Sequence, residues 1–337
     1  MEDFFETAKT NLIYFIIESF YALKDAVFVG INHRLNIVWI FFALFLACLI
    51  YFLRDRENSI STFGLSNIKN VIKYCLPRSV FLHWSSLLDY KFYFVNSILT
   101  KFITFTTLVI TVVAASDFYT ALLGLVFVEG DIISSTNITT TFYTIFAILS
   151  LDFALWVSHY ITHKVPILWE FHKIHHAAAV LNPVTAYRIH PVEKIVQGIC
   201  IAIILGFVNA IFIFFIDGDV RAFTIWSTSI ATIGSNFYAN LRHSHIWLDF
   251  GSVIGRVVSS PAQHFIHHST AKEHLDKNFA IVFSLWDWIF GTLVIPKEKT
   301  QLNIGLANNE HLEYSSVWGL YFTPFAKARK LFWSYLS

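Results

Sequence analysis

The chain has 337 residues, of which 55% are hydrophobic, 18% aromatic and only 14% charged. A typical soluble domain contains about 25% charged residues, so the composition favours a membrane protein. The 35 phenylalanines and 10 tryptophans exclude disorder. The formal net charge of +1 excludes a protein that binds nucleic acid through an excess of positive charge. The three cysteines are scattered, which gives neither a disulfide framework nor a cysteine zinc motif.

Apolar runs in chain order predict about five membrane-embedded helices, because a span requires about 20 apolar residues. Residues 1–34 come first; they are apolar but interrupted by charge, which predicts an interfacial amphipathic helix. The acidic residues Glu2, Asp3 and Glu6 argue against a cleaved signal peptide in this segment. The five expected spans then cover residues 35–53, 102–128, 141–161, 195–216 and 223–241, the last of which is rich in serine and threonine.

Positive charge predicts the orientation of these spans. With five spans, segments 54–101, 162–194 and 242–337 share one side, and they hold 20 of the 24 lysines and arginines. The positive-inside rule makes this side cytoplasmic. The histidine clusters all fall on it, so we expect a multi-pass, all-α integral membrane protein with a cytoplasmic histidine-rich cap, in a bacterial inner membrane or the endoplasmic reticulum. The opposite side holds Lys9, Lys24, Arg34 and Arg221.

Histidines are the strongest chemical signal in the chain, since 11 of the 15 lie between His159 and His268. Ten of these 11 occur as one HxxxH, two HxxHH groups and one HxH, and His190 stands apart from them. On a helix, residues three and four positions apart share a face, so an HxxxH or HxxHH group offers two or three imidazoles to one centre. The groups are His159 and His163; His172, His175 and His176; His243 and His245; and His264, His267 and His268.

The eight imidazoles of the HxxxH and HxxHH groups are more than one ion can use, which predicts a two-metal centre. Imidazoles near a bilayer are costly to desolvate unless something satisfies them. Imidazole binds Fe, Zn, Cu and Ni, and ligand type alone does not distinguish them. Structural zinc uses four ligands, usually with cysteine, and the sequence offers no such set. Eight or more neutral imidazoles leave the charge of the metal ions uncompensated, so bound oxo or hydroxo anions are expected, which favours iron that handles O₂ over a sealed structural site.

These groups and their surroundings resemble the fatty acid hydroxylase/sterol desaturase superfamily of integral-membrane di-metal oxygenases. The resemblance covers about residues 145–295, in the family's order and near its spacing. It rests on Asp152-Phe153, Trp156, His159, His163, Pro166, Leu168-Trp169, Phe171-His172, His175-His176, Arg188-x-His190-Pro191-x-Glu193, His243-Ser244, Pro261-x-x-His264-x-x-His267-His268-Ser269, Asp276-x-Asn278-Phe279 and Trp286-Asp287-x-x-Phe290-Gly291-Thr292.

The resemblance implies a di-iron centre that uses O₂ and two external electrons to hydroxylate or desaturate a lipid C–H bond. Two positions depart from the family pattern: Tyr160 and Ala280 stand where many members have Arg and Gly. His245 stands where Asn is common, which leaves open whether His243 or His245 contacts metal. The implied ligands are His159, His163, His172, His175, His176, His264, His267 and His268, with His243 as a ninth.

Other polar residues near these groups are expected to orient the ligands or to line the substrate entrance, because ligating imidazoles usually donate their second N–H to a carboxylate or carbonyl. Asp152 lies about 10 Å from His159 along one helix face, so we expect it to join helices or bind water rather than metal. The full set is Asp152, Arg188, His190, Glu193, His245, Asp276 and Asn278.

The sequence implies partners as well. It contains no dinucleotide fingerprint, haem-attachment motif or cysteine cluster. Electrons must then come from a separate donor, such as a cytochrome b5-type protein or a ferredoxin with its reductase. The resemblance is compatible with a sterol, fatty acyl chain, ceramide or alkyl-ether lipid as substrate. It divides the chain into an N-terminal part (1–140), a fatty acid hydroxylase-type catalytic region (141–295) and a cytoplasmic tail (296–337).

Three alternatives remain at this stage. The first is a di-zinc membrane hydrolase that uses metal-activated water. The second is a non-catalytic metal transporter, whose histidines should lie at mid-membrane rather than at helix ends. The third is a structural or partner-binding membrane protein that has kept the fold without the activity, against which the intact histidine set argues.

Overall fold

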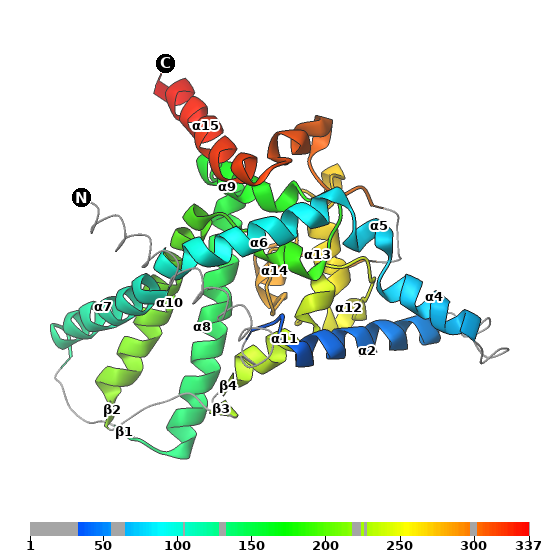
Figure 1. Ribbon diagram of the computed structural model, residues 1–337. Helices are drawn as coiled ribbons and strands as arrows, with labels where there is room; N and C mark the ends of the chain where they lie inside the picture. Colours follow the sequence, from blue (N-terminus) through cyan, green and yellow to red (C-terminus); the bar gives the residue numbers. More distant parts are fainter. Residues whose placement is uncertain are drawn as a thin grey trace, which may run out of the picture.

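A computed structural model describes residues 33–54, 65–103, 105–127, 133–217, 224–225, 228–296 and 302–336. Within these ranges the chain is mostly helical, as the sequence predicts (Figure 1). The interfacial helix expected in residues 1–34 lies almost entirely outside the described residues.

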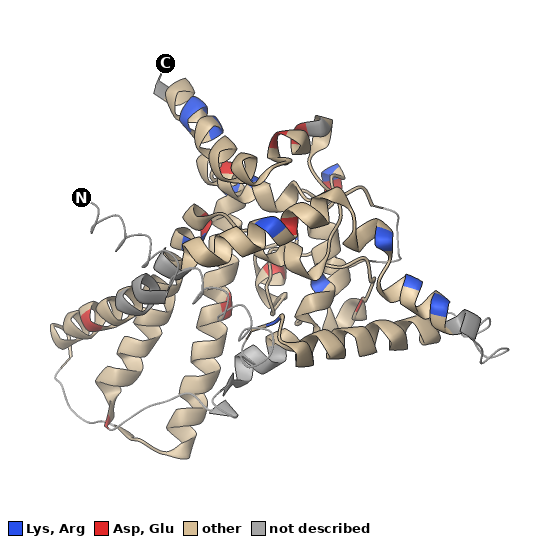
Figure 2. Ribbon diagram, in the orientation of Figure 1, with Lys and Arg blue, Asp and Glu red and all other residues tan. Residues whose placement is uncertain are grey.

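Two long antiparallel helices form the apolar body of the molecule (Figure 1). They are α8 (Asn137–Lys164) and α10 (Pro191–Phe215), and within the described ranges only these two are long and apolar enough to cross a membrane. Asp152 and Lys164 are the only acidic or basic residues of α8 other than histidine, and α10 carries Glu193 and Lys194 in its first turn and no charge after them (Figure 2). Their uncharged lengths suit a lipid environment.

Helix α7 (Phe105–Gly124) packs against α10 through small residues. A Cβ atom added to Gly206 of α10 would lie 2.8 Å from the Cβ atom of Ala115 in α7, so only glycine allows this approach. At the end far from the histidines, two short strands join the ends of α8 and α10. Strand β1 (Ile133–Ser134) pairs in parallel with β2 (Ile216–Asp217).

One expected span differs from the prediction. Residues 223–241 do not form one helix: the structure has strands β3 (Thr224–Ile225) and β4 (Thr228–Ser229) and then α11 (Ile230–Arg242), which has 13 residues. A helix of that length spans about 20 Å, less than the bilayer core. The β-branched residues before it favour extended backbone.

Helix α2 (Ile37–Arg54) matches the first expected span in sequence, but it packs beside α11 and α4 (Leu65–Cys75) rather than along α8 (Figure 1). Ala43 and Ala47 of α2 share an apolar core with Cys75 and Leu241.

A proline redirects the chain where α8 ends. Val165 is extended, with φ −94° and ψ 111°, as expected for a residue before proline, and Pro166 occupies the first position of α9 (Pro166–His176). The turn folds α9 back, so its histidines approach those at the end of α8.

Short helices and loops complete a cap over this end of the molecule. A buried ion pair between Asp89 of α6 and Arg188, with Nε–Oδ1 2.8 Å, fixes the segment after α9. Asn182 and Thr185 donate hydrogen bonds to the same carboxylate. The cap elements are α5 (Arg78–Phe81), α6 (Trp84–Ile103), η1 (Pro183–Tyr187), α12 (Gly251–Ile254), α13 (Pro261–His267), η2 (Lys272–His274) and α14 (Leu285–Ile289).

The segment expected as a tail is part of this packed cap. It contains η3 (Ala307–Tyr314) and α15 (Val317–Leu336). Leu320 of α15 is fully buried against Phe92 and Ile174. Glu310 accepts ion pairs from both Lys173 of α9 and Lys327 of α15, which fastens the last helix to the histidine-bearing helix.

Candidate metal centre

Nine of the predicted histidines come together in two adjacent clusters. Within each cluster the ring nitrogens lie within 4.8 Å of one another, so each could hold a metal ion. The clusters touch, since the ring centroids of His176 and His268, one from each, are 4.7 Å apart. The first cluster is His159, His163, His172, His176 and His267; the second is His175, His243, His264 and His268.

Each HxxHH group divides between the clusters in a way that follows from helix geometry. The i, i+4 pairs His172/His176 and His264/His268 each stay together, one pair in each cluster. The middle members, His175 and His267, go to the opposite cluster from their own pair. Neighbouring helix positions project about 100° apart, so consecutive histidines face different centres. Both groups are thereby tied to both clusters.

The imidazole nitrogens converge on the two centres. The Nε2 atoms of His243 and His264 are 2.8 Å apart, and those of His175 and His243 are 3.2 Å apart. In the first cluster, Nε2 of His159, His163 and His267 is buried without a hydrogen-bond partner. Buried polar atoms are rarely left unsatisfied. An all-nitrogen set of lone pairs aimed at common points fits metal ions of the kind that imidazole binds.

The outer nitrogens of the first cluster are held by protein oxygen atoms. Nδ1 of His159 donates to the carbonyl of Phe279 at 2.7 Å, and Nδ1 of His267 donates to that of Lys277 at 2.8 Å. Nδ1 of His172 lies 3.1 Å from Oε1 of Glu193. His163 approaches Asp276 with Nδ1–Oδ1 3.4 Å. The two hydrogen bonds fix the rings of His159 and His267 with Nε2 turned inward, and the two carboxylates lie beside the outer nitrogens of His172 and His163.

Burial keeps the clustered imidazoles neutral. Desolvation, reinforced by neighbouring histidines, holds the pKa values of His175, His176 and His268 well below their ordinary value. Desolvation also lowers the pKa of His267, to about 3. A neutral imidazole keeps the lone pair that a metal needs, so these residues are ready to bind at pH 7.

One face of α8 fixes the loop that supplies the Phe279 carbonyl. The buried Asp287 accepts hydrogen bonds from the backbone N–H groups of Phe279 and Ala280 and from the indole of Trp156 in α8. Asp152, one turn earlier on α8, accepts from the N–H groups of Val282 and Phe283 and from the indole of Trp286. Asp152 therefore joins helix to loop and lies outside both clusters.

The two acceptor carbonyls flank a strained turn. Asp276 and Asn278 have φ values of 55° and 59°, which few residues other than Asn, Asp and Gly adopt. The Asn278 side chain donates to the carbonyls of Gln263 and Val294, so it locks the turn against α13.

Three other candidate residues serve the fold instead of the clusters. His190 accepts from the N–H of Val192 at the start of α10, and its Nε2 donates to the carbonyl of Tyr321. Arg188 pairs with Asp89, as described above. His245 donates to the carbonyl of Tyr74 at 2.6 Å, whereas His243 lies in the second cluster.

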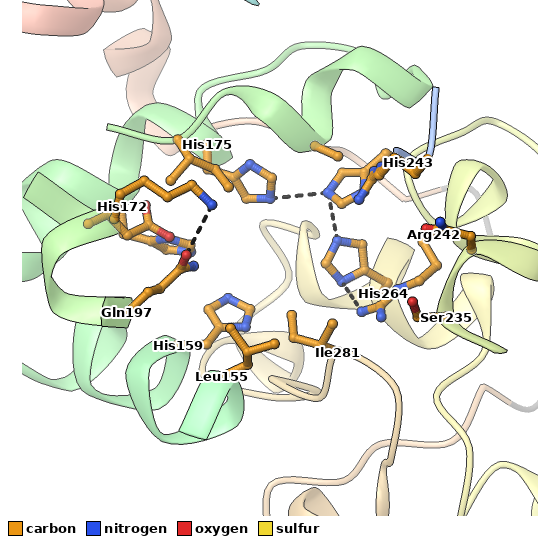
Figure 3. Close-up of a pocket in the computed structure, with 17 residues that line it drawn as sticks. Leu155, His159, His172, His175, Gln197, Ser235, Arg242, His243, His264 and Ile281 are labelled. Atoms are coloured by element: carbon orange, nitrogen blue, oxygen red, sulfur yellow. Dashed lines mark hydrogen bonds and ion pairs between the residues drawn. The ribbon is translucent and has the colours of Figure 1, made fainter. Parts of the chain in front are cut away.

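A cavity of about 290 Å³ opens beside both clusters. In Figure 3 the rings of His159, His175, His243 and His264 face this common space. Apolar residues such as Leu155 and Ile281 line part of it. Its polar lining consists of Arg34, Glu193, Lys194, Gln197, Ser235, Asn236 and Arg242, together with the histidines.

The position of Arg34 relative to the histidines differs from the one that the sequence predicted. The sequence placed it on the side of the membrane opposite to the histidines, yet it lines the same cavity as His159 and His243. The carbonyl of Arg34 also accepts a hydrogen bond from Asn240, two residues before Arg242. Helix α2 starts at the cavity and follows α11, so it does not carry residue 34 away from the clusters.

Comparison with known proteins finds a family match over the segment that carries the clustered histidines. The fatty acid hydroxylase family matches residues 144–292. Alkylglycerol monooxygenase from Caenorhabditis elegans is 26% identical over 190 residues, which cover 54% of this chain and 34% of that protein. The human alkylglycerol monooxygenase is 28% identical over 160 residues, covering 47% and 32%.

A bacterial relative is the ornithine lipid hydroxylase OlsE of Rhizobium tropici, 26% identical over 165 residues, or 49% of this chain and 46% of that protein. The chain thus spans about a third to a half of the length of these relatives. No solved structure gives a significant match. The stretch that matches the fatty acid hydroxylase family contains all nine clustered histidines and the loop that orients them.

Proposed function

We propose that the protein is a membrane-bound lipid hydroxylase that uses O₂ and a pair of iron ions. The observation that carries the proposal is the pair of all-histidine clusters, which touch each other and open onto one cavity. The relatives' names, which describe a monooxygenase and a hydroxylase acting on lipids, support hydroxylation over desaturation.

The reaction balances with an external reductant. One atom of O₂ enters a C–H bond of the lipid to give C–OH, and the other leaves as water with two protons and two electrons. A one-electron carrier protein, such as a cytochrome b5-type protein or a ferredoxin, would supply the electrons, because the sequence contains no redox cofactor motif. Iron held by these histidines would supply the redox chemistry that activates O₂.

The protein's own residues hold the centre and exclude water. The first cluster offers five imidazoles to one ion and the second offers four to the other. Glu193, Asp276 and the carbonyls of Phe279 and Lys277 fix ring orientation in the first cluster. Leu155 and Ile281 provide apolar wall beside the histidines.

We further propose that α8 and α10 lie in the bilayer with the clusters at its cytoplasmic face. The histidine end of α8 and the Glu193 end of α10 meet at the cap, and the uncharged lengths of both helices extend away from it (Figure 2). A soluble electron carrier would then reach the cap from the cytoplasm. Helices α2, α7 and α11 would complete a membrane-embedded body of about five helices. Of these, α11 would enter only part of the bilayer.

The test is metal analysis joined to turnover. We expect protein purified without chelators to contain two irons per chain and to consume O₂ when a reductase, a carrier protein and an alkyl lipid are all present, with a hydroxylated lipid detected by mass spectrometry. Chelation should abolish this activity, and added iron should restore it. Stoichiometric zinc that persists after iron-replete expression, without O₂ uptake, would instead support a di-zinc hydrolase and contradict the proposal.

Substitution of Glu193 by alanine is expected to weaken metal binding by about 10–100-fold, because His172 loses the carboxylate that orients it. Glu193→Gln keeps an acceptor oxygen and should lose less. Competition of the protein with a chromophoric chelator for Fe(II) measures the affinity. Glu273→Gln, at an exposed carboxylate outside the clusters, is the control. Unchanged affinity in Glu193→Ala would refute the orienting role.

A further inference from the structure

The cavity beside the clusters is lined by more basic than acidic side chains, which is unexpected for a site that binds hydrocarbon. Arg34, Lys194 and Arg242 line it, and Glu193, which is engaged with His172, is the only acidic residue among the lining residues. A lining suited to an alkyl chain alone would be apolar. Three basic side chains at one small cavity therefore call for a ligand of opposite charge.

Arg34 is the strongest indication of an anionic ligand in this cavity. Its Nε and Nη2 atoms are buried and have no hydrogen-bond partner among the residues that the structure describes. The guanidinium lies over the ring of Tyr187, with Cζ 5.1 Å from the ring centroid, which orients the group without using its N–H donors. Unsatisfied buried donors on a charged group are costly, so a native partner is expected.

Among the described residues, the other two basic side chains of the cavity donate hydrogen bonds to neutral partners. Nη2 of Arg242 is already used by the carbonyl of Ala280 and by His264. Nζ of Lys194 donates to Gln197, which is neutral. The nine imidazoles add no compensating negative charge, and bound metal ions would increase the positive excess.

We propose that this cavity binds the anionic head group of a lipid, with an oxyanion such as a phosphate held by Arg34 and Lys194. The inference rests on the proposed function and deepens it by naming the class of substrate. The cavity volume of about 290 Å³ admits a head group and the first carbons of a chain, not a whole lipid. Because five histidines line the same space, the C–H bond that is oxidised lies close to the head group instead of at the far end of the chain.

The experiment compares two lipids with the same alkyl chain, an alkylglycerol phosphate and the corresponding alkylglycerol. Dissociation constants are measured for the full chain in detergent, both metal-loaded and metal-free, without turnover. We expect the phosphate lipid to bind at least about 10-fold more tightly, since hydrogen bonds to charged groups are strong. Arg34→Gln should remove most of this preference, Arg34→Lys should retain part of it, and Arg256→Gln, at an exposed arginine, should leave it unchanged.

Lys194→Gln provides a second variant on a different element, so the test does not depend on whether a single variant folds. A smaller preference in this variant supports the proposal. Equal affinity of the wild-type protein for the two lipids, or a preference unchanged in both variants, would overturn it. Inorganic phosphate that competes as well as the phosphate lipid would overturn the lipid as the source of the oxyanion.

The outcome is separable from that of the proposed function. Oxidation of alkyl lipids without a head-group preference would leave the hydroxylase standing and remove this site. Tight binding that depends on Arg34, in a protein that never consumes O₂, would retain the site and remove the hydroxylase.

Discussion

Replacing His175 and His267 together by alanine is expected to abolish binding of both metal ions, because the two residues belong to different clusters. The two clusters divide the HxxHH groups, so this double variant takes one ligand from each centre. Replacing His159 and His267 together, which both belong to the first cluster, should leave one ion bound at the second. Hydroxylation should fall by at least about 100-fold in both variants, because loss of an orienting partner alone costs 10–100-fold.

Metal per chain, measured by mass spectrometry of the purified protein, distinguishes these outcomes. His245→Ala is the matched control, since His245 is bonded to the Tyr74 carbonyl outside the clusters and should keep both ions. Equal metal content in the two double variants would show that the division of ligands between the centres is wrong.

Substitution of Asp287 by alanine is expected to give the largest loss of stability in the chain. This carboxylate is 0% exposed and accepts hydrogen bonds from the N–H groups of Phe279 and Ala280, the Trp156 indole and the Thr292 hydroxyl. Each buried donor left without a partner costs about 1–3 kcal/mol, so the free energy of unfolding should fall by at least about 3 kcal/mol.

Thermal unfolding in detergent measures this loss, with the exposed Glu273→Ala as control. Asp287→Asn, which retains one acceptor oxygen, should lie between the wild type and the alanine variant. Metal affinity should fall as well, because the Phe279 carbonyl that holds His159 belongs to the same loop. A wild-type unfolding temperature in Asp287→Ala would contradict the role assigned to this residue.

The histidine spacing predicted the residues that meet, but not how they divide. Helical periodicity places His172 and His176 on one face, and the structure keeps them in one cluster. Which centre receives His175 or His267 depends on the packing of α13 against α9, and spacing along the chain carries no information about that packing. The sequence favoured His243 as a ligand without deciding between it and His245; the structure places His243 in the second cluster and bonds His245 to the Tyr74 carbonyl.

Hydropathy was a weaker guide to the N-terminal part. It treated residues 35–53 as a span and so placed Arg34 far from the histidines, whereas α2 packs along α11 and begins at the cavity. Apolar residues that face a neighbouring helix and apolar residues that face lipid look the same in a sequence. The sequence could not identify the carbonyls of Phe279 and Lys277 as acceptors, because every residue has a carbonyl. The nearest signal in the sequence was the Asp276-x-Asn278 pattern, whose two residues have positive φ values in the structure.

The division of the two HxxHH groups has a consequence for biosynthesis. The second cluster takes His175 from α9 and His268 from the end of α13, and the first cluster needs His267 as well. Neither centre can therefore be completed on a nascent chain until the ribosome has made the last of these segments. Loading of the two centres would follow synthesis of His268, and a polypeptide terminated before His267 would lack ligands of both centres.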